Sequence, residues 1–269
     1  MLNTDLERCT GRNAPLRGGA WRRLVHGLVL GLLVVSGSIV AALPADVILV
    51  LDNSGSMRSN DPQFLLKPAV NGFVTELDSE TRVGMIIFDH KVHYAVPLGP
   101  LDPASREALG RSLEGIDYRG QFTDSPAAIE RAIYALKANG REDVARVIVF
   151  MTDGIVDTGN AGIDAEKAAW LRDELATDAA NNDIRIFGIA FTDEADFFLI
   201  QSLAKKTEGE YFRAPRPEQL ADVFATIQQR LAAPPVSARP GPAPAPMPAV
   251  EPAVEPVADK PPPAAAPAT

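Results

Sequence analysis

Short apolar runs alternate with amphipathic stretches between residues 45 and 231. The apolar runs are rich in Val, Ile, Leu and Phe, a pattern that predicts strands. Most of them are apolar without interruption, which is typical of strands buried on both faces of a parallel sheet. Strands are predicted at 47–51, 83–88, 92–96, 147–151 and 184–191, with a shorter sixth strand at 210–213.

The stretches between these runs carry apolar residues at helical spacing. Asp61-Pro62 has the form of an N-cap followed by proline at the first helical position, and Gly140 is an expected helix stop. Pro68 is expected to separate a short first turn from the main part of the first helix. Helices are predicted at 62–77, 103–115, 127–139, 163–180, 196–204 and 217–231.

This alternation predicts a single α/β domain over residues 45–231. The domain should be doubly wound and Rossmann-like, with a mostly parallel six-stranded sheet flanked by helices. The run at 92–96 follows the strand at 83–88 after a short turn. It is therefore expected to be the one antiparallel strand, at an edge of the sheet.

The segment before the domain predicts export. Residues 1–23 are polar and contain five arginines, and residues 24–43 are almost wholly apolar. A run of about 20 apolar residues is long enough for a transmembrane anchor, and it also fits a signal sequence. Since the arginines precede it, residues 1–23 should be cytoplasmic, and the domain should lie on the periplasmic or extracellular side of a bacterial cell envelope. No clear A-x-A cleavage site follows, which favours an uncleaved membrane anchor.

The segment after the domain is rich in proline and alanine. Residues 232–269 contain no aromatic side chain and only scattered charges. Such a segment cannot bury enough apolar surface to fold, so a disordered, polyproline-like tail is predicted.

Charge and cysteine content narrow the classes of function. The formal net charge is −9 and the isoelectric point is near 4.9. This balance argues against a nucleic-acid partner. Cys9 is the only cysteine of the sequence, so an intrachain disulfide is excluded.

The first predicted strand ends in a group of oxygen-bearing side chains. Asp52, Ser54 and Ser56 occupy alternate positions, and Gly55 allows a tight turn between them. One carboxylate and two hydroxyls form half of a coordination shell for a hard divalent cation. The alternative is a polar turn in which a serine caps the next helix.

Two further loops complete a candidate site. Thr123 opens the helix at 127–139, and Asp153 follows the strand at 147–151. All three loops should meet at the carboxyl edge of the sheet, where α/β folds bind ligands. Two carboxylates and three hydroxyls suit Mg²⁺ or Mn²⁺, and the absence of Cys and His from these loops disfavours zinc.

These motifs resemble those of the von Willebrand factor type A domain over about residues 45–231. The segment D-N-S-G-S-M matches the D-x-S-x-S signature of that family, G-x-x-T-D-S-P-A-A-I matches its threonine loop, and M-T-D-G matches its aspartate loop. The resemblance implies a metal-ion-dependent adhesion site, in which a carboxylate of a partner takes the open position on the metal. Its metal residues would be Asp52, Ser54, Ser56, Thr123 and Asp153.

One local departure from the family concerns the threonine loop. Gln121-Phe122 stands where many members have a pair of glycines, so this loop should be stiffer here.

Three functions are compatible with these features. The first is a membrane-tethered binding module, without enzymatic activity, that captures an Asp or Glu of a protein partner through the cation. The second is a non-catalytic co-subunit of an ATPase-driven assembly, which export would deprive of ATP. The third is a metal-dependent hydrolase with Asp52 as the nucleophile, against which the sequence shows no D-x-D, no P-loop, no H-E-x-x-H and no G-x-S-x-G motif.

Overall fold

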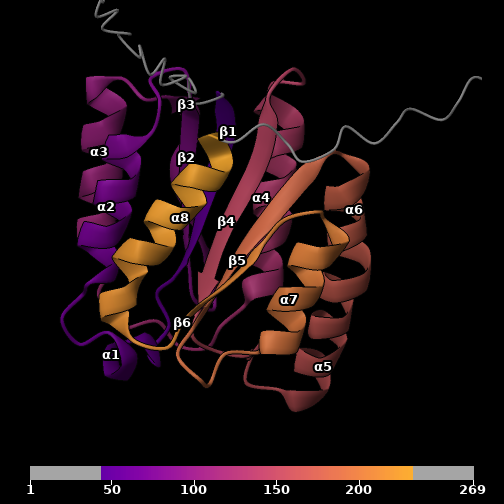
Figure 1. Ribbon diagram of the computed structural model, residues 1–269. Helices are drawn as coiled ribbons and strands as arrows, with labels where there is room; N and C mark the ends of the chain where they lie inside the picture. Colours follow the sequence, from indigo (N-terminus) through magenta and orange to yellow (C-terminus); the bar gives the residue numbers. More distant parts are fainter. Residues whose placement is uncertain (1–43, 233–269) are drawn as a thin grey trace, which may run out of the picture. The chain divides into compact units, whose positions relative to one another are not determined.

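The computed structural model describes residues 44–232, which form a central sheet between two layers of helices (Figure 1). The strands are β1 (Ala45–Asp52), β2 (Arg82–Phe88), β3 (Val92–Pro100), β4 (Ala145–Thr152), β5 (Ile184–Phe191) and β6 (Tyr211–Ala214). The α-helices are α1 (Met57–Asn60), α2 (Leu66–Glu76), α3 (Pro103–Glu114), α4 (Ser125–Asn139), α5 (Ala161–Trp170), α6 (Ala176–Asn181), α7 (Phe197–Lys206) and α8 (Leu220–Ala232). A π-helical turn, η1 (Leu171–Leu175), joins α5 to α6, and a 3₁₀ turn, η2 (Pro217–Gln219), precedes α8.

The six strands form one sheet in the order β3-β2-β1-β4-β5-β6. β1 pairs in parallel with β2 and β4, and β5 pairs in parallel with β4 and β6. β3 is antiparallel to β2 and lies at the edge of the sheet. The predicted fold class is therefore confirmed, including the antiparallel edge strand.

The uninterrupted apolar run of β1 supplies both cores, because successive residues of a strand point to opposite faces. Val47, Leu49 and Leu51 pack toward the layer of α2, α3 and α8. Ile48 and Val50 pack toward α4, η1, α6 and α7. Among the described residues, the two clusters extend from Ala45 to Leu231 and cover both faces of the sheet.

The order of the strands reverses between β1 and β4. From β1 the chain runs outward through β2 to β3, and it then returns to β4 on the other side of β1. The loop after β1 leads to the α2 layer, whereas the loop after β4 leads to α5 in the other layer (Figure 1). Divergent loops of this kind open a crevice at the carboxyl ends of the two strands, which is where α/β folds bind ligands.

α2 corresponds to the helix predicted at 62–77, but it begins later than predicted. α2 begins at Leu66, four residues after Pro62, rather than directly after Asp61. The buried carboxylate of Asp61 nevertheless caps it, because it accepts hydrogen bonds from the backbone N–H groups of Leu65 (2.7 Å) and Leu66 (3.0 Å). Pro68 falls in the first turn of α2, where no backbone donor is required of it.

The helix predicted at 163–180 is interrupted. Residues 161–181 are helical throughout, but η1 inserts a π turn at 171–175 between α5 and α6. Leu171 and Leu175, which flank this turn, both remain buried against the sheet.

The predictions for residues 1–23, 24–43 and 233–269 lie outside the described residues and stay predictions. Ala232, the first residue of the predicted tail, is the last residue of α8. Within residues 44–232, no helix is long and apolar enough to span a membrane.

An ion pair fixes the end of the sheet opposite to the candidate site. Asp46, near the start of β1, is fully buried and accepts hydrogen bonds from Nε (2.9 Å), Nη2 (2.7 Å) and the backbone N–H (2.6 Å) of Arg141. These bonds connect the loop before β4 to β1, so they set the relative position of the two strands whose far ends carry Asp52 and Asp153.

We expect Asp46→Ala to lower the free energy of unfolding of residues 44–232 by about 2–4 kcal/mol, because it removes several charge-assisted hydrogen bonds at once. Asp143→Ala is the matched control, since Asp143 is an exposed carboxylate in the same loop. Its effect should stay within about 0.5 kcal/mol. Urea unfolding measures both variants, and equal effects of the two would refute the role assigned to Asp46.

Candidate metal centre

The carboxylate of Asp52 lies at the carboxyl end of β1 and is fully buried. The backbone N–H of Ser54 donates to its Oδ1 at 2.7 Å, and Thr152 Oγ1 donates to its Oδ2 at 2.6 Å. Thr152 is the last residue of β4, which pairs directly with β1. The two strand ends thus hold this carboxylate in one orientation.

Asp153 follows β4 and brings a second carboxylate into the same crevice. Its Oδ1 accepts a hydrogen bond from Ser56 Oγ at 2.8 Å, and its Oδ2 accepts one from Asn60 Nδ2 at 2.7 Å. Ser56 Oγ also lies 3.0 Å from Ser54 Oγ. The two serines of the loop after β1 and the aspartate of the loop after β4 therefore form one continuous row of oxygens.

Thr123 reaches this row from a third loop, between α3 and α4. The point that a Cβ of residue 154 would occupy lies 3.7 Å from Thr123 Oγ1 and 4.0 Å from Ser56 Oγ. Because residue 154 is glycine, the two hydroxyls border the same small space. A pair of backbone hydrogen bonds with Asp157, of 2.7 and 3.1 Å, fixes Thr123 against the loop after β4.

Gly120 allows the third loop to approach the first. Its N–H donates to the carbonyl oxygen of Asn53 at 3.1 Å. A Cβ at this position would lie 2.3 Å from the Cβ of Asp89 and 2.8 Å from the Asn53 oxygen, both too close for any side chain. Glycine is thus required here by the close approach of the backbone.

The two carboxylates raise the energy of the ionised centre. Burial, and next the nearby negative charge of Asp153, raise the pKa of Asp52 to about 7, although hydrogen bonds from Thr152 and Ser54 oppose the shift. Burial also raises the pKa of Asp153, against hydrogen bonds from Asn60 and Ser56. Burial therefore disfavours the ionised form of both carboxylates.

The donor set fits a divalent cation with oxygen ligands. Within residues 44–232, neither Asp52 nor Asp153 forms an ion pair with a Lys, Arg or His side chain. The described residues contain no cluster of three or more His, Cys, Asp or Glu placed to share a metal, so carboxylates alone would not complete a shell. Two carboxylates with three hydroxyls supply five oxygen donors of the kind that Mg²⁺ and Mn²⁺ accept, and they leave the sixth position of an octahedral shell open. The structure brings all five predicted residues together, while metal binding by them stays a prediction.

Gln121-Phe122, which replaces the glycine pair found in many family members, includes a residue with an unusual backbone conformation. Phe122 has φ +56°, in the left-handed region that glycine adopts without strain. Its ring lies against Gly159, where an added Cβ would be 2.8 Å from two ring atoms. The ring thus packs on the loop after β4.

Several supporting residues escaped the sequence analysis. Asn60 binds Asp153 and Thr152 binds Asp52, as described above. Asn53 Oδ1 accepts hydrogen bonds from the backbone N–H groups of Asp117 (3.0 Å) and Tyr118 (2.8 Å), and so holds the start of the third loop. The position of Thr152 directly before Asp153 could have indicated its role from the sequence. The role of Asn60 could not be predicted in this way, because it depends on how α1 is folded.

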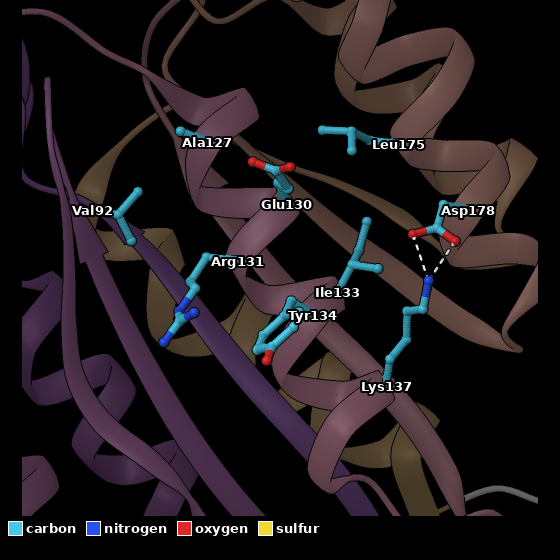
Figure 2. Close-up of a pocket in the computed structure, with 9 residues that line it drawn as sticks. All are labelled: Val92, Ala127, Glu130, Arg131, Ile133, Tyr134, Lys137, Leu175 and Asp178. Atoms are coloured by element: carbon cyan, nitrogen blue, oxygen red, sulfur yellow. Dashed lines mark hydrogen bonds and ion pairs between the residues drawn. The ribbon is translucent and has the colours of Figure 1, made fainter.

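A second hollow lies elsewhere on the domain. It has a volume of about 650 Å³ and lies over α4, beside η1 and α6. Figure 2 shows Tyr134 and Arg131 on α4 and the ion pair between Lys137 and Asp178 that connects α4 to α6. None of the five predicted metal residues lines it.

Comparison with known proteins identifies related chains. The sequence pattern of the von Willebrand factor type A domain matches residues 46–226. An uncharacterized protein of Synechocystis sp. is 24% identical over 190 residues. This match covers 71% of the present chain and 42% of the relative, so the chain spans less than half the length of that relative.

Solved structures show the same fold at low sequence identity. The PilB minor pilin of Streptococcus sanguinis superposes with a TM-score of 0.59 at 15% identity, covering 71% of this chain and 62% of the pilin. An aerotolerance-related membrane protein of Bacteroides fragilis superposes with a TM-score of 0.54 at 19% identity, covering 70% of this chain and 98% of that protein.

The raised pKa of Asp52 predicts how stability varies with pH in EDTA. Because the pKa is about 3.8 for an unperturbed Asp and about 7 in the folded state, the folded state binds more protons between these values. The contribution of Asp52 to stability is therefore greatest below pH 4 and is lost as the pH rises to 7, by up to about 4 kcal/mol.

Asp52→Asn removes this titration. In EDTA at pH 8 the variant should be more stable than the wild type, and at pH 4 the two should differ little. Thermal unfolding of residues 44–232 across this range is the measurement. Parallel pH profiles of the two proteins would contradict the electrostatic description of the centre.

Proposed function

The chain belongs to the von Willebrand factor type A domain family, and we propose that it is an exported, membrane-tethered binding module. Its ligand would be an Asp or Glu side chain of a protein partner, captured through Mg²⁺ or Mn²⁺. One observation carries this proposal. Two buried carboxylates and three hydroxyls lie together at the carboxyl edge of the sheet, and no Lys, Arg or His of the described residues pairs with either carboxylate.

The residues proposed to hold the cation come from three loops, and all present oxygen atoms to it. They are Asp52, Ser54, Ser56, Thr123 and Asp153. When bound, the cation supplies the positive charge that attracts a carboxylate of the partner. The hydroxyl ligands are neutral, so they leave most of this charge available.

Asn60 and Ser56 are proposed to control how much charge Asp153 adds. They occupy both oxygens of its carboxylate in the present structure. If these hydrogen bonds keep Asp153 one water away from the cation, the centre retains net positive charge and binds an acidic ligand more tightly. A change in the position of the loop after β4 would then alter affinity for the ligand.

The location in the cell envelope rests on residues 24–43 and the arginines before them. The fold shared with a minor pilin and with an aerotolerance-related membrane protein supports it. We propose that the module has no catalytic activity. His90 and His93 lie 2.9 and 3.3 Å from oxygens of Asp89, so both imidazoles pair with a carboxylate that is not one of the proposed metal residues.

Thermal unfolding of residues 44–232 in EDTA, Mg²⁺, Mn²⁺ and Ca²⁺ tests the metal centre. A cation that binds only the folded state stabilises it by roughly 2.7 kcal/mol at a hundredfold excess over Kd, so we expect the melting temperature to rise with Mg²⁺. A well-folded domain that responds to none of the cations would refute the centre.

Ser56→Ala removes one of the proposed metal ligands and can be tested in the same experiment. Ser56 donates a hydrogen bond to Asp153, so its loss should lower the melting temperature in EDTA somewhat and should reduce the Mg²⁺ response by at least half. Ser59→Ala, in the short helix that follows Ser56, is the matched control and should keep the full response. Equal responses of the two variants would remove Ser56 from the centre.

The proposed topology is tested with reporter enzymes fused after Ala45. A reporter that is active only in the periplasm should be active, because the preceding arginines retain the N-terminus in the cytoplasm. Activity of a cytosolic reporter instead would support the co-subunit function and overturn the proposed location.

A further inference from the structure

Exposed apolar side chains gather at the carboxyl edge of the sheet. Among residues 44–232, the exposed large hydrophobic side chains are Phe122 (42%), Tyr134 (61%), Ile155 (61%), Ile163 (44%) and Phe198 (84%). Tyr134 lies on the outer side of α4 (Figure 2). The other four, which we call the apolar rim, belong to the threonine loop, the loop after β4, and the first turns of α5 and α7.

Two members of the apolar rim are close in sequence to candidate metal residues, and a third lies in the first turn of α5, which follows the loop after β4. Phe122 directly precedes Thr123, and Ile155 comes two residues after Asp153. The ring of Phe122 contacts Gly159, shortly before α5, whose first turn carries Ile163. Phe198 lies farther out at the same edge, in the first turn of α7. A ligand at the centre would therefore meet apolar side chains beside the cation.

Such a surface fits a carboxylate flanked by apolar residues, and this chain contains that pattern. Residues 249–256 consist of the tetrapeptide Ala-Val-Glu-Pro repeated twice, which places Glu251 and Glu255 between valine and proline. Proline-rich sequences in general favour extended conformations, so a ligand of this composition loses less conformational entropy on binding. We propose that this segment binds the metal centre of its own chain, with Glu251 or Glu255 on the cation and the valines on the apolar rim.

The length of the tail permits this contact. α8 begins shortly after the carboxyl end of β6, and its 13 residues carry the chain about 20 Å away from that edge. Glu251 follows Ala232 by 19 residues, which span up to about 59 Å in a polyproline-like conformation. The return distance along the domain is thus well within reach.

Tethering makes this contact competitive with free ligands. A segment joined by a short flexible linker acts at an effective concentration of about 1 mM. If the segment alone binds with a Kd of about 0.1 mM, the tethered copy lowers the apparent affinity for any other acidic ligand about tenfold. The tail would then restrict the module to partners that displace it. This inference rests on the proposed metal centre.

The test uses a fluorescent peptide of residues 247–258 and two proteins in detergent, the full chain and a chain ending at residue 232. Fluorescence anisotropy should show Mg²⁺-dependent binding to the shortened chain, abolished by EDTA. Binding to the full chain should be about tenfold weaker. Glu251→Gln combined with Glu255→Gln in the full chain should restore the affinity of the shortened chain, because the tethered competitor is lost.

Two point variants of the shortened chain test the rim. Phe122→Asn tolerates the positive φ and removes the ring, so peptide affinity should fall about fivefold while the Mg²⁺-dependent rise in melting temperature stays. Tyr134→Asn removes an exposed ring away from the centre and should change neither quantity.

The outcomes separate the two proposals. If Mg²⁺ raises the melting temperature but the peptide does not bind the shortened chain, the tail inference is wrong and the metal centre stands. Equal binding to both chains would exclude occupation by the chain's own tail. Full binding by a peptide with both glutamates changed to glutamine would exclude the carboxylate contact. Absence of any Mg²⁺ effect on unfolding would refute the metal centre and this inference with it.

Discussion

The proposed metal centre depends on the burial of two carboxylates at one point of the fold. Asp52 and Asp153 end neighbouring parallel strands, so the pairing of β1 with β4 forces their carboxylates into the same crevice. Neither has a cationic partner among the described residues, and burial raises the pKa of both. In the proposed function, a divalent cation would relieve this repulsion and would supply the positive charge that attracts the acidic ligand. The features that favour such a cation are therefore the same ones that make the metal-free domain less stable above neutral pH.

The fold positions this centre through a small number of rigid connections. The pairing of β1 and β4 sets the two carboxylates, while Asp46 and Arg141 fix the opposite end of the same strands. The threonine loop depends on Gly120, which allows close approach to the Asn53 carbonyl group. Since the loops meet only at the strand reversal, the hydroxyls of Ser54 and Ser56 come from one part of the chain and that of Thr123 from another.

The chain has the fold of the von Willebrand factor type A family, and the surface beside its candidate metal centre carries an aromatic residue of the threonine loop. Phe122 adopts a backbone conformation typical of glycine, and its ring is partly exposed beside Thr123. This aromatic side chain adds an exposed apolar surface to the threonine loop. Such a rim favours ligands whose carboxylate lies in an apolar setting, as in the Ala-Val-Glu-Pro repeats of the tail.

The sequence alone determined the order of the strands and helices along the chain and the five candidate metal residues, because continuous apolar runs ending in Asp52 and Asp153 are local signals. Two predicted helices differ from the structure in where they begin or in their continuity. The Asp61-Pro62 pattern caps α2 from four residues away, and the π turn at 171–175 has no clear local signature. Only the tertiary structure decided that Asn60 binds Asp153, that Thr152 binds Asp52, and that four exposed apolar side chains share one edge of the sheet. These relations join residues distant in sequence, and the packing of loops in three dimensions sets them.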